Sequence, residues 1–214
     1  MPRTNKDFAS RKEQLIQLAL GQFIEKGYEN TTIMDLQRCF GLTKGGMYHY
    51  FNSKEEILDA VIEYGLSQET KGLIEELGQI PLEGRLIHFF FSTTTNTFTK
   101  NLFKYSKSNS SSIVAYRLRE KTTQMLIPIL KIIMGQSIES GFYKSEYSDE
   151  MAEFSIVLAL AITEAGMLPE ADPTHKKKRI DALLDMWRKC MEPPAEHIHE
   201  LKMNLYKLIN TEES

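Results

Sequence analysis

Residues 31–58 read TTIMDLQRCFGLTKGGMYHYFNSKEEIL, and this stretch decides the fold. Thr32 begins a Thr-x-x-Asp pattern, in which a hydroxyl and a carboxylate three residues later cap the start of a helix. A short helix is therefore expected from Thr32 to just before Gly41. Thr43 predicts the start of a second short helix, which reaches to about residue 50. The Ser-Lys-Glu-Glu pattern at 53–56 predicts the start of a longer one.

Helical periodicity also precedes this stretch. Apolar residues between Phe8 and Lys26 recur at intervals of three and four, and Gly27 stands where a left-handed C-terminal cap is expected. A helix, a short turn containing glycine and a second short helix form a helix-turn-helix, in which the second helix enters the major groove of DNA. The alternative is a three-helix packing unit with no role in nucleic-acid binding.

Two adjacent glycines, Gly45 and Gly46, stand in the first turn of the expected recognition helix. Each costs about 1 kcal/mol relative to alanine in a helix interior. Because a missing side chain lets backbone N–H groups approach a phosphate or a base edge, closer contact with DNA would offset this cost. The glycines therefore favour DNA binding over simple packing.

The outward face of this region carries the candidate DNA contacts. Lys44 has the length to reach a phosphate or a guanine edge, and the tyrosines offer hydroxyls to phosphates. Packing against the next helix, or plain exposure to solvent, is the alternative for the aromatic members. The predicted DNA-binding residues are Thr32, Thr43, Lys44, Gly45, Gly46, Tyr48, His49, Tyr50 and Lys54.

Composition is that of an ordinary globular protein, with 42% hydrophobic and 26% charged residues among 214. Residues 1–54 hold 8 Lys plus Arg against 5 Asp plus Glu, a balance of +3, and the remainder holds 18 against 24, a balance of −6. A weakly basic head thus precedes an acidic body. No secretory leader is apparent, and the apolar run 154–162 is half the length of a membrane span. We expect a cytoplasmic protein without membrane contact.

The sequence gives little support for a bound metal or cofactor. The two cysteines lie far apart and form no Cys-x-x-Cys pattern, and His197 and His199 fall on different faces of a helix. No catalytic triad, paired carboxylates or phosphate-binding glycine loop stands out. We therefore expect no cofactor, no metal and no enzymatic activity.

The whole chain is predicted to be all-α, with about nine to ten helices. We expect a helix-turn-helix DNA-binding domain at residues 1–52 and a helical effector-binding and dimerisation domain at 53–214. The Thr-rich residues 92–98 have strand propensity but no apparent partner strand, so a helix is expected there. Pro128 is expected to kink or break the long helix that ends before Gly141.

The stretch at 31–58 closely resembles the DNA-binding signature of the tetracycline-repressor (TetR) family of transcriptional regulators. The paired threonines, the Lys-Gly pair and the Ser-Lys-Glu-Glu segment all fall in register, and the match covers about residues 8–60. The resemblance implies a three-helix DNA-binding head, a linking fourth helix and a helical body that binds a small-molecule effector and dimerises. Gln37 and Gly46 depart from the family's usual pattern.

Within the body, an aromatic-rich region is the candidate effector pocket that the resemblance implies. Aromatic residues at helical spacing are otherwise typical of a core. The predicted ligand-binding residues are His88, Phe91, Thr95, Phe98, Tyr116 and Met125.

The helix expected after Ser148 is apolar on more than one face. Because a surface helix is normally amphipathic, this helix would bury one side in its own domain and another against a second copy of the chain. A central core helix in a monomer is the alternative. The predicted interface residues are Phe154, Val157, Leu158, Ala161, Leu184 and Trp187.

These observations predict a ligand-responsive transcriptional regulator, most simply a repressor, that binds a palindromic operator as a homodimer and is released by a small-molecule effector. The competing hypothesis is a helical interaction adaptor that keeps the fold without sequence-specific DNA binding.

Overall fold

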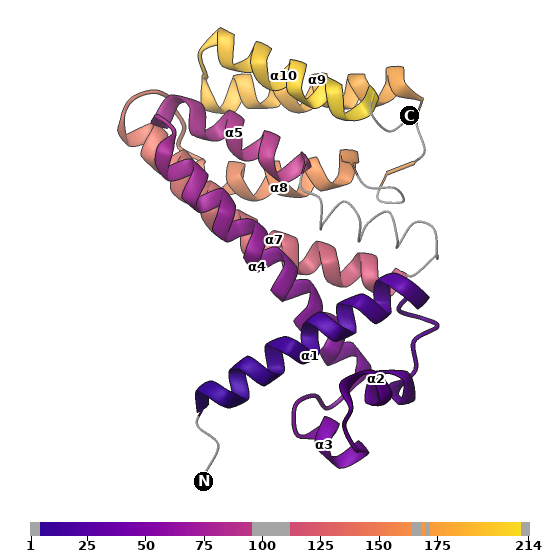
Figure 1. Ribbon diagram of the computed structural model, residues 1–214. Helices are drawn as coiled ribbons and strands as arrows, with labels where there is room; N and C mark the ends of the chain where they lie inside the picture. Colours follow the sequence, from indigo (N-terminus) through magenta and orange to yellow (C-terminus); the bar gives the residue numbers. More distant parts are fainter. Residues whose placement is uncertain (1–4, 96–111, 164–167, 170–171, 211–214) are drawn as a thin grey trace. The chain divides into compact units, whose positions relative to one another are not determined.

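The computed structural model describes residues 5–95, 112–163, 168–169 and 172–210 (Figure 1). Nine α-helices lie within these residues, which confirms the all-α prediction. The chain divides into two compact units, residues 1–68 with 101–121 and residues 69–100 with 122–214. Helices α4 (Lys54–Gln79) and α7 (Ser112–Glu139) contribute to both units.

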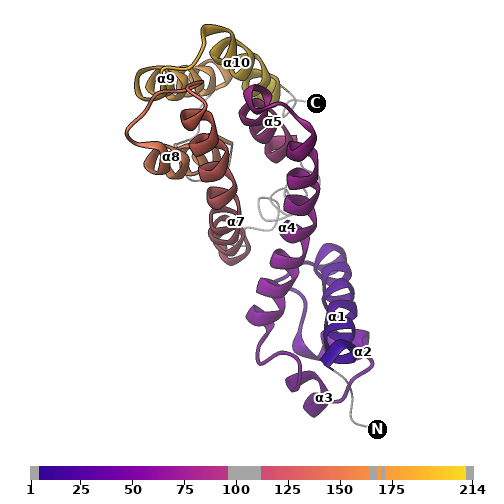
Figure 2. The same cartoon turned by 90° about the vertical axis from the view of Figure 1, so that its left-hand side faces the viewer.

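The first unit contains α1 (Asn5–Lys26), α2 (Ile33–Phe40) and α3 (Lys44–Tyr48), together with the first turns of α4 and α7. Helix α1 packs on α2, and α2 packs on α3 (Figure 2). Gly27 and Gly41 have positive φ values of 89° and 63°. These conformations allow the turns that follow α1 and α2. The core of this unit includes side chains that are at most 1% exposed, among them Leu15, Leu36, Met47, Phe51, Ile57 and Leu58.

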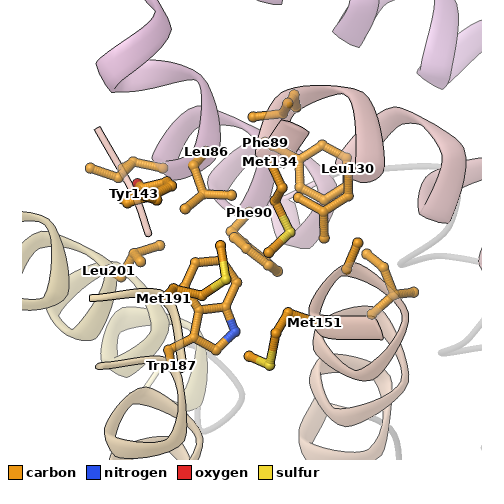
Figure 3. Packing of buried hydrophobic residues seen from close by; sticks show 14 of the residues in the cluster. Leu86, Phe89, Phe90, Leu130, Met134, Tyr143, Met151, Trp187, Met191 and Leu201 are labelled. Atoms are coloured by element: carbon orange, nitrogen blue, oxygen red, sulfur yellow. The ribbon is translucent and has the colours of Figure 1, made fainter. Parts of the chain in front are cut away.

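The second unit contains α5 (Leu82–Thr95), α8 (Ser148–Thr163), α9 (Pro173–Met191) and α10 (Ala195–Asn210), with the remaining turns of α4 and α7. Helix α9 packs against both α8 and α10, and α10 also contacts α5. Trp187 lies at the centre of its core beside Phe90, Met151 and Met191 (Figure 3). Its indole N–H donates to the buried Ser155 hydroxyl at 2.7 Å, so the polar edge of the ring is satisfied.

The sequence predicts a kink or a break at Pro128, and the structure excludes the break, because α7 continues from Ser112 to Glu139. A proline in a helix interior costs about 3 kcal/mol. The turn that follows it buries Leu130, Ile133 and Met134 almost completely, and this burial offsets the cost.

The Thr-rich segment forms the end of α5, as predicted. The Thr93 hydroxyl donates to the Phe89 carbonyl at 2.8 Å, a bond between side chain and backbone that helices accommodate. Residues 96–98 of the Thr-rich segment lie outside the described residues. Composition also predicts a loop at the Ser-rich residues 106–112. Ser112 instead begins α7, and residues 106–111 lie outside the described residues. None of the described helices combines the length and the apolarity that a bilayer crossing requires.

Candidate nucleic-acid interface

The turn between α2 and α3 is fixed by backbone bonds and one side-chain cap. Gly41 takes the left-handed conformation, with φ 63°, and its N–H donates to the carbonyl of Arg38. The Thr43 hydroxyl accepts from the N–H of Gly46 at 3.2 Å and so caps α3, as the sequence predicted. This geometry is that of a helix-turn-helix, with α3 in the place of the recognition helix.

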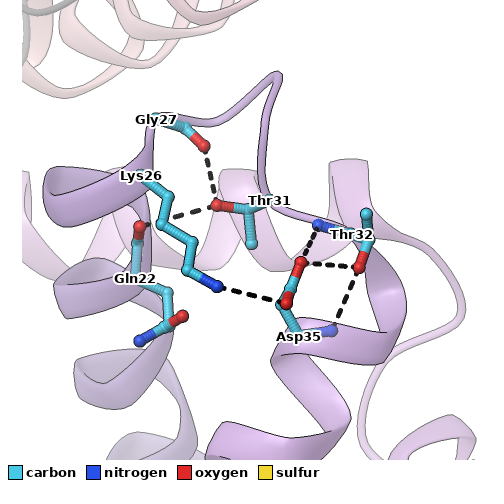
Figure 4. A network of polar contacts seen from close by, with 6 residues as sticks. All are labelled: Gln22, Lys26, Gly27, Thr31, Thr32 and Asp35. Atoms are coloured by element: carbon cyan, nitrogen blue, oxygen red, sulfur yellow. Dashed lines mark hydrogen bonds and ion pairs between the residues drawn. The ribbon is translucent and has the colours of Figure 1, made fainter.

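The start of α2 shows the predicted capping box (Figure 4). The Thr32 hydroxyl accepts from the Asp35 N–H at 3.1 Å, and the Asp35 carboxylate accepts from the Thr32 N–H at 3.0 Å. Lys26 at the end of α1 adds an ion pair of 3.1 Å to the same carboxylate. The bonds from Thr32, followed by Lys26, hold the pKa of Asp35 well below its usual value. The Thr32 hydroxyl also donates to Asp35 at 2.6 Å, so its proton is already engaged within the protein.

The surface of α3 is open at most of the predicted contact positions. Thr43, Lys44, Gly45 and His49 are exposed, and the Tyr48 side chain is 44% exposed. These residues belong to α3 or lie directly beside it in the sequence. They therefore form a continuous candidate surface for DNA.

The fold itself does not demand glycine at position 45. Neither Gly45 nor Gly46 has a positive φ, and a Cβ added at Gly45 meets no atom within 4 Å. A Cβ at Gly46 would lie 3.4 Å from the Thr43 hydroxyl oxygen, an ordinary contact. Local packing therefore leaves room for a side chain at both positions, and the fold by itself does not explain the glycines.

Tyr50 departs from the prediction, because its side chain is only 7% exposed. Its ring stacks on Phe8 of α1, with the ring centroids 4.8 Å apart and the planes 13° apart. Helix α3 ends at Tyr48, two residues earlier than expected, so the chain turns and directs Tyr50 inward. The expected position of the Tyr50 ring on the outward face is therefore wrong.

Lys54 lies at the first turn of α4, close to the turn that follows α1. Its ammonium group lies 4.1 Å from the centroid of the Tyr28 ring and donates to the Glu29 carbonyl at 3.4 Å. Partial burial lowers the pKa of Lys54. Burial, followed by the charge of Glu55, raises the pKa of Tyr28 to about 12. Lys54 is thus held in place, and is only partly exposed.

Three supporting residues were missed in the sequence. Phe8 contacts Tyr50 and His49, Tyr28 holds Lys54, and the Arg11 guanidinium donates to the Phe40 carbonyl at 3.3 Å, at the end of α2. Each lies on α1 or just after it, far in sequence from the group it contacts. Helical periodicity marks Phe8 as an inward position, but nothing local identifies its partner.

The predicted effector residues lie in different parts of the chain. His88 pairs with Glu76 at 2.7 Å, Phe91 is 46% exposed, and Met125 is partly buried, all in the second unit. Tyr116 is 57% exposed and belongs to the first unit. Thr95 ends α5, and Phe98 lies outside the described residues.

The six predicted interface residues divide into two groups. On α8, Phe154, Val157 and Leu158 are 54%, 44% and 36% exposed and form an apolar outer face. The other three positions are buried inside the second unit and supply its core, namely Ala161 at 8%, Leu184 at 5% and Trp187 at 2%.

Comparison with known proteins agrees with this geometry. The model of the family described as "Bacterial regulatory proteins, tetR family" matches residues 15–61, which run from α1 into α4. The transcriptional repressor KstR2 of Mycolicibacterium smegmatis is 38% identical over 61 residues, which are 28% of this chain and 30% of that protein. The regulator TtgR of Pseudomonas putida is 31% identical over 61 residues, which are 28% of this chain and 29% of that protein. The matched stretch thus spans less than a third of each of these two relatives.

Solved structures extend the likeness to the whole fold. RolR in complex with resorcinol aligns with a TM-score of 0.61 at 18% identity, over 93% of this chain and 96% of that one. A TetR transcription regulator from Haloarcula marismortui aligns with a TM-score of 0.60 at 16% identity, over 86% of this chain and 99% of that one. These similarities define an all-α protein with a helix-turn-helix head. Over residues 15–61, the head of the chain matches the tetR family of bacterial regulatory proteins.

Proposed function

We propose that the protein is a transcriptional regulator, most simply a repressor, that binds a palindromic operator as a homodimer and releases it when a small molecule binds. One observation carries the proposal, namely the capped helix-turn-helix whose second helix exposes Lys44, Gly45 and Tyr48 together. The named relatives KstR2 and TtgR are a transcriptional repressor and a transcriptional regulator, and each matches 61 residues of this chain.

In this proposal residues 1–52 bind DNA, and residues 53–214 bind the effector and dimerise. Lys44 and Tyr48 contact phosphates or base edges, while Lys54 contacts the backbone beside the major groove. The Thr32 hydroxyl is engaged by Asp35, so Thr32 contributes to DNA binding by capping the start of α2. Because the Tyr50 ring is buried, Tyr50 supports the site by packing and not by contact with DNA.

The exposed apolar face of α8 supports a homodimer, because Phe154 and Val157 remain 54% and 44% exposed. Two copies related by a twofold axis would place their recognition helices in successive major grooves about 34–36 Å apart, or a multiple of that distance. The operator is accordingly an inverted repeat.

Effector binding in the second unit would change operator affinity through α4, which contributes turns to both units. RolR, which shares the fold, is described with resorcinol bound. The predicted candidates in that unit are His88, Phe91, Thr95 and Met125. Tyr116 belongs to the first unit, and Phe98 lies outside the described residues.

The test is selection of duplexes from the source genome by the full-length protein, followed by footprinting of the enriched sequences. We expect an inverted repeat and an affinity that falls steeply with salt, because phosphate contacts release counterions. An interaction adaptor would enrich no sequence and show no footprint. Lys44→Ala would weaken operator binding by about tenfold, within the 1–3 kcal/mol that a good base contact contributes. Its dimerisation would remain intact.

A further inference from the structure

Phe8, in the second turn of α1, contacts two residues that follow the recognition helix directly. Its ring lies 4.8 Å from the Tyr50 ring in a stacked arrangement, and 5.4 Å from the His49 ring at an interplanar angle of 83°. His49 and Tyr50 also contact each other edge to face at 5.3 Å. The three rings form a cluster that joins the start of α1 to the end of α3.

This cluster matters because α3 is only five residues long. An isolated helix of that length does not persist in water, so its direction depends on tertiary contacts. Met47 and Phe51 anchor α3 in the core, where each is 0% exposed. Phe8 contacts the two residues that follow the C-terminal end of α3, and His49 is the one ring of the cluster that is exposed at the candidate DNA surface.

We propose that Phe8 is a positioning residue for operator recognition. It does not contact DNA; it fixes the rings of His49 and Tyr50 and thereby the orientation of α3. Contacts with base edges require that orientation, whereas non-specific binding depends on phosphate charge and tolerates small rotations of the helix. Phe8 therefore controls the ratio of specific to non-specific affinity. This inference rests on the proposed DNA-binding function.

The test compares the full-length wild-type protein with Phe8→Ala, Phe8→Tyr and Leu18→Ala, on the selected inverted repeat and on a duplex of scrambled sequence. Leu18 is the matched control, since it is an apolar residue of the same helix and is 41% exposed. Phe8→Ala should weaken operator binding by about tenfold, equivalent to about 1.4 kcal/mol. Its affinity for the scrambled duplex should stay within about twofold. Phe8→Tyr keeps the ring and should restore the ratio, and Leu18→Ala should leave it unchanged.

A second readout follows the cluster directly. The ring protons of His49 feel the ring current of Phe8, so their NMR shifts in the free protein should move toward those of an unstacked imidazole in Phe8→Ala. Phe8→Tyr should keep the wild-type shifts. A merely structural role would lower both DNA affinities by the same factor as the folded fraction falls.

Equal losses on both duplexes would overturn the proposal, and so would unchanged operator affinity in Phe8→Ala. Should that variant fail to fold, Phe8→Leu keeps the apolar volume without the ring. An unchanged specificity ratio for Phe8→Leu would again overturn it, and a lowered ratio would support it. Failure of the DNA-binding function itself is separate, because the wild-type protein would then enrich no duplex at all, and both proposals would fall.

Discussion

The Lys54 ammonium group lies 4.1 Å from the centre of the Tyr28 ring, and Tyr28 itself is only 4% exposed. The ring compensates part of the cost of removing the charge from water, through a cation–π interaction. The turn after α1 and the start of α4 are thereby joined through a side chain that we also propose as a phosphate contact. Lys54 is therefore expected to have two separable effects, one on stability and one on DNA binding.

Lys54→Met should therefore change two measurements at once. Loss of the cation–π contact should lower the free energy of unfolding by about 0.5–1 kcal/mol, as measured by urea denaturation. Loss of a phosphate contact should reduce the slope of log K against log salt by about 0.9 per protomer. Lys71→Met, at an exposed position further along α4, is the control and should change neither. An unaltered salt slope for Lys54→Met would show that this lysine serves the fold alone.

Gly45 and Gly21 allow stability and DNA approach to be separated. A Cβ at either glycine meets no atom within 4 Å, and both residues lie in helices. Alanine at either position should raise the free energy of unfolding by about 0.5–1 kcal/mol, because glycine loses more entropy on folding. Only Gly45→Ala should weaken operator binding, by about tenfold or more, since its methyl group would separate α3 from the groove. Equal operator affinity for the two variants would contradict the close approach of α3.

The Asp35 carboxylate predicts a pH dependence of stability with a definite sign. Its folded pKa lies below the value of 3.8 in the unfolded chain, because Thr32 and then Lys26 stabilise the charged form. The unfolded state therefore binds more protons as pH falls below about 4, and the stabilisation present at neutral pH is lost there. Asp35→Asn should be less stable than wild type at pH 7, and the difference should shrink by pH 3. Denaturant titrations at the two pH values measure it. A constant difference would mean that the carboxylate's charge has no part in the capping box.

The sequence predicted the parts of the head that depend on local signals. Thr32, Thr43 and Gly41 act on backbone groups within a few residues, so their roles can be inferred from spacing alone. The family resemblance rests on the same residues and adds the expected body. The structure confirms the capping box at Thr32, the cap of α3 at Thr43, the left-handed cap at Gly27 and the order of the helices.

The errors arose where a distant partner or a helix end decides the geometry. Tyr50 was placed outward by continuing the period of α3, whereas the helix ends at Tyr48 and the ring packs on Phe8. Trp187 lies on an apolar stripe that the sequence identifies, but periodicity does not tell which surface covers that stripe. The structure places Trp187 in the core of its own unit.

The apolar outer face of α8 provides a test of the homodimer. Phe154 is 54% exposed, so a charge at this position costs little in a monomer but would be buried without a partner in a dimer. Phe154→Glu should therefore convert the dimer to a folded monomer in light scattering, and should weaken operator binding by about 100-fold through the lost bivalency. Ile74→Glu, at a 55% exposed residue of α4, is the matched control and should remain dimeric. A Phe154→Glu protein that stays dimeric and keeps its operator affinity would show that another surface joins the two copies.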